Sequence, residues 1–176
     1  MRAVIKGKRV TLRKLKPSDA DAIQKYCNDP VISRWLMRLP HPYTKKHAVH
    51  FIRDGLKNWK KKTQYVYGII YEGKLVGTIH IKIEEEDRGQ IGYSIAKPYW
   101  GKGLMSEAAK LIIKEGFKTL KLHKIYATHH PKNPASGRVM QKAGMKYEGL
   151  LREHSKAKGK YWDLVHYGIL RREYKG

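Results

Sequence analysis

Hydrophobic residues recur along this chain with two periods, and the helical period dominates the first 62 residues. Apolar positions three and four residues apart predict a helix from residue 17 to about residue 29 and a longer one from residue 44 to about residue 62. Alternation at residues 9–15 predicts a strand ahead of them, and residues 31–39 are expected to form a short helix or an irregular segment. The two helices are expected to begin after the N-cap residues Ser18 and Thr44.

Beyond residue 64 the period changes to two, the period of a strand whose two faces have different surroundings. Three alternating segments separated by turns predict an antiparallel meander over residues 65–71, 74–83 and 90–96. A helix over residues 104–120 and a strand over residues 125–129 follow. Because a helical crossover joins them, this strand is expected to lie parallel to the last strand of the meander.

The last part of the chain predicts one more helix and a hairpin. Asn133 followed by Pro134 is typical of a helix start, and Gly144 is typical of the position just after a helix end. Two strands are then predicted at residues 145–154 and 161–170, around a basic loop at residues 155–160. Neither a repeat nor a linker divides the sequence, so residues 1–176 are expected to form one α/β domain with a mixed sheet.

The junction between the meander and the next helix carries the clearest chemical signal. A short turn, Trp100-Gly101-Lys102-Gly103, joins the strand to the helix. Glycines let the backbone approach a ligand, and the free N–H groups and dipole of a helix start favour an anion. Lys102 adds a positive charge to the turn. An ordinary tight turn would use the same residues, so the local pattern is consistent with both interpretations.

The charge balance points to anionic partners. Lys and Arg number 38 against 15 acidic residues, a formal net charge of +23, whereas 41% hydrophobic residues indicate a globular protein. Such a field favours nucleic acid, the ribosome, anionic lipid or a polyphosphate cofactor. A Lys-rich solvated surface of the kind found in thermophile proteins would have the same composition.

Several kinds of site and location are disfavoured by the composition. A single cysteine, Cys27, excludes an internal disulfide, and no acid or cysteine near His123, His129 and His130 completes a set of metal ligands. No apolar run reaches the length of a membrane-spanning helix, and the N-terminus has no hydrophobic signal core. We therefore expect a cytoplasmic protein without a metal or a membrane contact, and the sequence leaves the oligomeric state open.

Two segments give the chain a resemblance to a known family. They read IGYSIAKPYWGKGLMSEA at residues 91–108 and NPASGRVMQKAGMKYEGLLRE at residues 133–153. With the predicted order of elements, they resemble a GNAT-fold N-acetyltransferase over nearly the whole chain. Within that superfamily the chain resembles the RimJ/RimL branch, whose namesakes acetylate the N-terminal amines of ribosomal proteins. The resemblance implies a mixed, partly splayed central sheet with helices on both faces, and acetyl-CoA as cosubstrate.

The resemblance also implies roles for individual residues. Backbone N–H groups of the glycine turn would hold the pyrophosphate, and the end of the preceding strand would pair with the pantetheine arm like an added strand. The implied cofactor-binding residues are Tyr93, Ser94, Ile95, Trp100, Gly101, Lys102, Gly103, Leu104, Met105, Ser106 and Asn133. Ser136 is implied to be the general acid for the departing thiolate, with Asn133 as the second residue of the catalytic pair. Considered locally, Asn133 is a helix cap and Ser136 a solvated first-turn residue.

Two positions depart from the pattern of the family. Met105 stands where glycine or alanine is usual, and Gln90 stands where similar sequences often carry a glutamate that could act as a base. The remaining candidates for the base are Glu148, Glu153, His129, His80 or water. An α-amine has a pKa near 8, so a fraction is neutral without a strong base.

Three functions are consistent with these observations. The first is acetylation of a protein N-terminus. If the family fold holds, residues 35–43 and the basic residues 155–160 would flank the acceptor. The basic residues suit an acidic acceptor or contact with ribosomal RNA. The second is acetylation of a small amine such as a polyamine, an amino acid or an aminoglycoside. The third is a weakly catalytic module that binds RNA or the ribosome, although the sequence has no paired aromatic strand motif for RNA.

Overall fold

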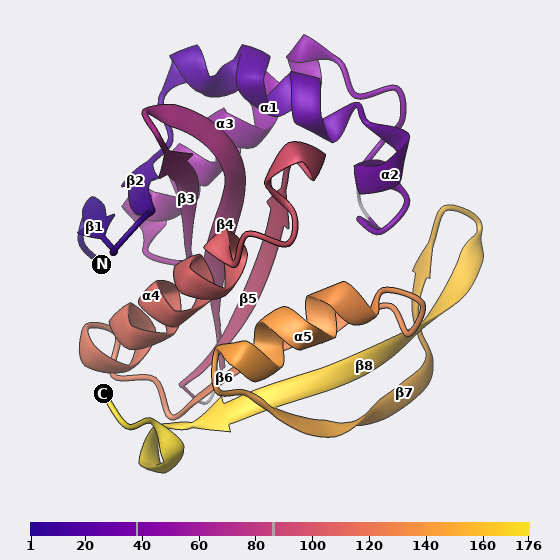
Figure 1. Ribbon diagram of the computed structural model, residues 1–176. Coiled ribbons are helices and arrows are strands. Elements are labelled where there is room, and N and C mark those ends of the chain that lie inside the picture. Colours follow the sequence, from indigo (N-terminus) through magenta and orange to yellow (C-terminus); the bar gives the residue numbers. More distant parts are fainter. Residues whose placement is uncertain (38, 86) are drawn as a thin grey trace.

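A computed structural model describes residues 1–37, 39–85 and 87–176, and in these residues eight strands form one mixed sheet. The sheet order is β1-β2-β3-β4-β5-β6-β8-β7 (Figure 1). The strands are β1 (Val4–Lys6), β2 (Thr11–Lys14), β3 (Gln64–Tyr71), β4 (Lys74–Glu84), β5 (Arg88–Ile95), β6 (Lys124–His129), β7 (Lys146–Ala157) and β8 (Lys160–Leu170). The helices are α1 (Ala20–Cys27), α2 (Pro30–Ser33), α3 (Lys45–Lys61), α4 (Leu104–Lys118) and α5 (Pro134–Lys142), with short 3-10 turns at Pro17–Asp19, Lys97–Tyr99 and Arg171–Glu173.

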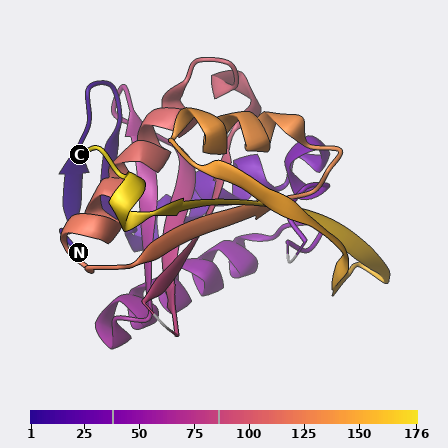
Figure 2. The ribbon, with the colours of Figure 1, turned by 90° about the horizontal axis from the view of Figure 1, so that it is seen from below.

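The predicted parallel pair lies at the centre of the sheet. All other neighbours pair antiparallel, whereas β5 and β6 pair parallel, with residues 88–90 opposite residues 124–126. Beyond residue 90, β5 stays paired with β4 as far as Ile95, while β6 turns away with β8 and β7 (Figure 2). The sheet is therefore splayed between β5 and β6, as the resemblance implies.

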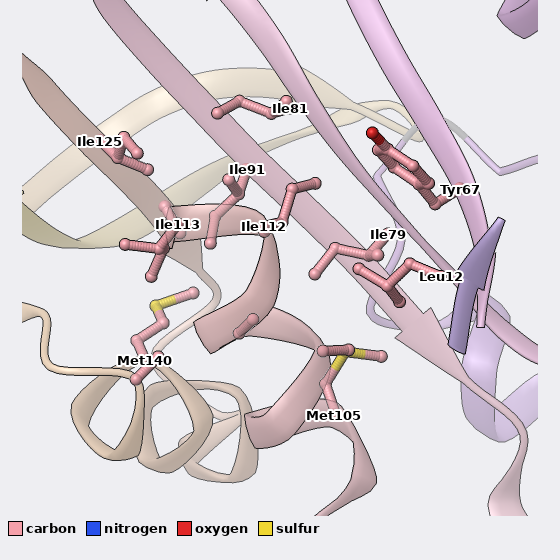
Figure 3. Packing of buried hydrophobic residues seen from close by; sticks show 14 of the residues in the cluster. Leu12, Tyr67, Ile79, Ile81, Ile91, Met105, Ile112, Ile113, Ile125 and Met140 are labelled. Carbon is pink, nitrogen blue, oxygen red and sulfur yellow. The ribbon is translucent and has the colours of Figure 1, made fainter. Parts of the chain in front are cut away.

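Helices cover both faces of the sheet, as the resemblance implies. Figure 2 shows α3 on one side and α4 and α5 on the other. The larger core lies under α4, where Ile112 and Ile113 are fully buried against strand residues such as Ile79 and Ile81 (Figure 3). A second core joins α1, α2 and α3 to the opposite face through residues such as Ile23 and Ile52. Each side chain buried in this way contributes about 1.5–3 kcal/mol.

Most predicted elements are present, but their bounds differ at several places. The structure adds a short strand, β1, that was not predicted, and shortens the strand predicted at residues 9–15 to Thr11–Lys14. The hairpin strands extend further than predicted, to Ala157 and Lys160, so the predicted loop at residues 155–160 is wrong. The tight turn at Lys158 and Gly159 has positive φ angles of 51° and 74°, and therefore lets the strands pair almost to the tip. The turn predicted between the second and third strands of the meander includes residue 86, which lies outside the described residues.

Helix starts follow the prediction at Thr44 but not at Ser18. The Thr44 side chain accepts a hydrogen bond from the N–H of His47 and caps α3. At the start of α1, a 3-10 turn precedes the helix, and the side chain that accepts hydrogen bonds there is that of Asp19. It accepts two hydrogen bonds from the Arg13 guanidinium, at 2.7 and 2.8 Å, and one from the N–H of Lys16. The ion pair of Asp19 with Arg13, which lies on the preceding strand β2, takes the place of the predicted cap.

We expect Asp19→Asn to destabilise the fold by about 2–3 kcal/mol, because it leaves the Arg13 guanidinium without its charged partner. Burial acts to raise the pKa of Asp19, but Arg13 and the N–H of Lys16 lower it further, so the carboxylate is ionised in the folded state. Urea unfolding measures the loss. The matched control is Asp21→Asn, whose ion pair with Lys45 is exposed on both sides and should contribute under about 0.5 kcal/mol. Equal losses in the two variants would contradict this assignment.

Candidate active site

A cavity of about 560 Å³ opens where β5 and β6 separate. Its wall is built from the end of β5, the turn before α4, the end of β6, the start of α5 and the segment around α2. The predicted site residues that line it are Tyr93, Ser94, Ile95, Trp100, Gly101, Gly103, Leu104, Met105, Ser106, Asn133 and Ser136. Lys102 is not among the lining residues. Its ammonium group lies 5.5 Å from the ring centroid of Tyr99.

The turn before α4 has the geometry of an anion-binding helix start. Gly101 and Gly103 both have φ of 75°, a left-handed conformation that glycine adopts without strain. Gly103 is the N-cap of α4, so the free N–H groups of the first turn begin directly after it. Met105 is only 6% exposed and points toward the sheet core, so most of its side chain lies away from the turn (Figure 3).

The unpaired edge of β5 forms a second wall of the cavity. In the described part of the sheet, the pairing of β5 with β6 ends at Gln90, so the backbone of Tyr93 and Ser94 has a strand neighbour only on the β4 side. The indole nitrogen of Trp100 donates to the carbonyl of Ile95 at 2.8 Å and ties the turn to the end of this strand. An extended ligand with amide groups can add to such an edge as a further strand.

Tyr93 connects β5 to α5 through two hydrogen bonds. Its hydroxyl donates to the carbonyl of Ser136 at 2.9 Å, and the Ser136 hydroxyl donates to the Tyr93 oxygen at 3.0 Å. Burial raises the pKa of Tyr93 well above its ordinary value, so its phenol keeps its proton. Asn133 stands at the N-cap of α5, but its side chain makes no capping hydrogen bond. The local interpretation of Asn133 as a side-chain cap is therefore wrong, and its amide is available to the cavity that it lines.

On the other face of β5, Ser94 belongs to a cluster of hydroxyl groups that the sequence did not indicate. The Tyr26 hydroxyl from α1 lies 3.0 Å from the Thr78 oxygen and 3.3 Å from the Ser94 oxygen. Burial raises the pKa of Tyr26 strongly. The cluster fixes α1 against the strand whose edge lines the cavity. No local sequence signal predicts it, because 68 residues separate Tyr26 from Ser94.

A bridge of aromatic rings crosses one end of the cavity. His130 lies between Trp35 and Trp162, with ring centroids 5.8 and 4.8 Å away. Lys158, at the tip of the β7–β8 hairpin, donates to the carbonyl of Ser33 at 2.6 Å (Figure 1 shows the tip beside α2). Met37 and residues 39–41 line a second cavity together with Lys158, so parts of the two segments predicted to flank an acceptor lie close together. Residue 38 lies outside the described residues.

The candidate bases do not gather at one place. His129 lines the cavity, with Nδ1 2.9 Å from the carbonyl oxygen of His130 and with a buried Nε2 that has no hydrogen-bond partner. His80 lies against Gly92, and burial lowers the pKa of His80 to about 4. Glu148 forms an ion pair with Lys124 at 2.8 Å, and Glu153 is exposed on β7. Among the described residues that line the cavity none is acidic, and Arg138 and Lys142 are basic.

The described residues offer neither a cluster of metal-ligating side chains nor a membrane-spanning helix. They contain no group of three or more histidine, cysteine, aspartate or glutamate side chains placed to hold a metal ion. They also contain no helix with the length and apolar character needed to cross a membrane.

The helix start after the glycine turn can hold an anionic group, and the unpaired edge of β5 beside it can take up an extended ligand with amide groups. Residues 9–146 match the Acetyltransferase (GNAT) domain family, and the chain belongs to this family. It is an N-acetyltransferase, and enzymes of this family use acetyl-CoA.

Individual relatives agree with this assignment. The chain is 31% identical over 172 residues to "Uncharacterized N-acetyltransferase p20" of Bacillus licheniformis, covering 96% of each chain. It is 28% identical over 172 residues to "Putative ribosomal N-acetyltransferase YdaF" of Bacillus subtilis, covering 95% of this chain and 94% of the relative. Among solved structures, the ribosomal L7/L12 alpha-N-protein acetyltransferase RimL in complex with coenzyme A shares the fold, with a TM-score of 0.87 at 17% identity over 95% of this chain and 97% of that chain.

We expect Gly103→Ala to weaken acetyl-CoA binding about tenfold, or ~1.4 kcal/mol. A Cβ at this position would lie 3.3 Å from Arg9 Nη2, and the positive φ would strain the turn that presents the N–H groups. Isothermal titration with acetyl-CoA measures the change.

The matched control for this variant is Gly159→Ala. Gly159 has φ of 74° at the hairpin tip, and a Cβ there would meet nothing within 4 Å. Both variants should lose about 1 kcal/mol of stability from backbone strain. If Gly159→Ala weakened acetyl-CoA binding as much as Gly103→Ala, the turn before α4 would not be the binding element.

Proposed function

We propose that this enzyme transfers the acetyl group of acetyl-CoA to the N-terminal amine of a protein, by direct attack of the amine on the thioester. The observation that carries the proposal is the charge of the cavity wall, which includes Arg138 and Lys142 and, among its described residues, no carboxylate. A polyamine would meet like charges there. A peptide brings a single α-amine with a pKa near 8, part of which is neutral at physiological pH.

The donor side of the proposal assigns the turn before α4 to the pyrophosphate. Gly101 and Gly103 give the turn its shape, and the first N–H groups of α4, in Leu104, Met105 and Ser106, are directed to the anion. Lys102 contributes charge from the outer side of the turn, and Trp100 flanks it. The unpaired edge at Tyr93, Ser94 and Ile95 and the free amide of Asn133 suit the amide-rich pantetheine arm.

Acetyl-CoA supplies an activated acetyl group as a thioester, and the chain has to supply a proton for the sulfur that departs. Ser136 holds such a proton on Oγ, which points to the Tyr93 oxygen in the structure and can turn toward the cavity. Tyr93 keeps Ser136 in place through its second hydrogen bond to the Ser136 carbonyl. In this role Ser136 is the general acid and regains a proton from solvent before the next turnover, and Asn133 aligns the donor beside it.

The amine loses its proton without a carboxylate at the cavity wall. Of the four side chains considered as bases, His129 is the one that lines the cavity. Its unpartnered Nε2 lies on the α5 side, 2.8 Å from the position that a Cβ of Gly137 would take. We propose that the acceptor enters as a neutral amine and that water takes the proton after the attack.

The surface beside the cavity supports an acidic acceptor. Lys156, Lys158 and Lys160 lie around the hairpin tip that touches α2. These cations attract an acidic N-terminal peptide or nearby ribosomal RNA. The relative described as a putative ribosomal N-acetyltransferase supports a ribosomal protein as the source of this N-terminal peptide.

We expect Ser136→Ala to lower kcat about 100-fold with little change in the KM for acetyl-CoA, because the sulfur loses its proton donor. Steady-state kinetics with a peptide acceptor measures both constants. Tyr93→Phe is the companion variant. It removes the partner of Ser136 but not the Ser136 hydroxyl, so its loss of kcat should be smaller. Full kcat in Ser136→Ala, with an unchanged thermal midpoint, would rule out the general-acid role.

An acceptor panel tests the substrate class. We expect kcat/KM for peptides with a free N-terminus to exceed that for spermidine at least about tenfold, equivalent to ~1.4 kcal/mol. Peptides with an acidic sequence after the amine should be preferred, and the preference should weaken with added salt. The control is the same peptide with a blocked N-terminus and an internal lysine, which should not react. A clear preference for spermidine, amino acids or aminoglycosides would replace the proposal with small-molecule acetylation.

A further inference from the structure

Glu107 attaches the N-terminal segment to the first turn of α4. Glu107 accepts a hydrogen bond from the backbone N–H of Arg9 at 2.7 Å and another from that of Val10 at 3.1 Å. It also pairs with Arg9 Nε at 3.1 Å. Gly7 makes room for this contact, because a Cβ there would lie 2.6 Å from the Glu107 oxygen. Arg9 is thus held in a fixed orientation beside the start of α4.

From this position the Arg9 guanidinium reaches the turn itself. Its Nη1 donates to the carbonyl oxygen of Lys102 at 2.8 Å, and its Nη2 lies 3.3 Å from the position that a Cβ of Gly103 would take. In a trans peptide the C=O of one residue and the N–H of the next point in opposite directions. Arg9 therefore directs the Lys102 carbonyl outward, and the N–H of Gly103, a residue that lines the cavity, points away from the guanidinium.

We propose that Arg9 is a positioning residue for the pyrophosphate-binding turn, and that its hydrogen bond to the Lys102 carbonyl orients the Gly103 N–H toward the phosphate of the donor. The proposal rests on acetyl-CoA binding at this turn. It concerns the phosphate-bearing part of the donor alone, because the contacts of Arg9 lie at the turn and not at the Tyr93 and Ser136 hydroxyl groups.

The ion pair of Arg9 with Glu107 is expected to contribute little to the free energy of unfolding, so stabilising the fold is not its main role. The Arg9 side chain is 47% exposed, and an ion pair of this kind contributes little to stability. Arg2 and Glu115 form a similar pair between the N-terminal segment and α4, but at the far end of the helix from the turn. The chain therefore contains a control pair with the same chemistry and no contact with the turn.

The test compares two acetyl donors. Acetyl-CoA carries the pyrophosphate, whereas the acetyl thioester of N-acetylcysteamine has the same reactive group and no phosphate. We expect Arg9→Gln to raise the KM for acetyl-CoA about tenfold, or ~1.4 kcal/mol, with kcat preserved. The ratio of kcat/KM between the two donors should fall by the same factor. Arg2→Gln should leave that ratio unchanged.

A second variant separates positioning from charge. Arg9→Lys keeps the positive charge but loses the planar fork that contacts Glu107 and Lys102 together, so it should behave like Arg9→Gln. Titration with CoA alone, in the absence of any acceptor, should show the same tenfold loss of affinity in both variants.

Several outcomes would overturn the proposal. Equal losses with both donors would make Arg9 a structural brace, and no loss with either would remove its role. If Arg9→Lys bound CoA with wild-type affinity, Arg9 would act through its charge and not by positioning the turn. If wild-type protein did not bind CoA, the donor site and this proposal would both be wrong, whereas binding of CoA without acetylation of a peptide would refute only the proposed acceptor.

Discussion

The early end of the pairing between β5 and β6 is the constraint on which the rest of the site depends. The two strands are paired at residues 88–90 and 124–126, and then each follows a different half of the sheet. A strand edge left in this way presents N–H and C=O groups that need partners, since an unsatisfied buried backbone group costs about 1–3 kcal/mol. A ligand with amide groups along an extended chain satisfies them. The separation of the two strands also leaves space for the cavity. Ser136, on α5, lines this cavity and donates a hydrogen bond to the Tyr93 hydroxyl oxygen.

The site is assembled from segments that are far apart in the sequence. The turn before α4 has its shape from two local glycines, but its outward carbonyl is held by Arg9, 93 residues earlier. The strand that offers its edge is fixed on its other face by Tyr26, 68 residues from Ser94. The hairpin tip is held against α2 by Lys158, 125 residues from Ser33. Local sequence forms each surface, and long-range hydrogen bonds set how the surfaces face one another.

This division explains what the sequence could predict. The helical and alternating periods located the helices, the meander and the parallel strand, because each signal lies within one element. The turn at residues 100–103 and the helix starts at Thr44 and Asn133 were located for the same reason. The failed predictions concern contacts between elements. Asp19 pairs with Arg13 and displaces the cap expected at Ser18, the hairpin pairs to its tip, and the cluster of Tyr26, Thr78 and Ser94 has no sequence pattern. The strand β1, three residues long, is too short to show a period.

The placement of the acidic residues determines the charge of the cavity wall and therefore bears on the chemistry. With 15 acids against 38 basic residues, few carboxylates are available, and several of them are engaged by cations of the same chain, as Glu107 is by Arg9 and Glu115 by Arg2. Burial raises the pKa of each of these two carboxyls, but the hydrogen bonds that they accept lower it more, so both remain ionised and paired. The described wall of the cavity is left with basic residues and no carboxylate. A positively charged amine therefore gains nothing on entry, whereas a neutral amine enters without an electrostatic penalty. This is the physical basis of the acceptor that we propose, because the amine of a protein N-terminus has a pKa near 8, whereas the pKa of a lysine side chain lies near 10.4.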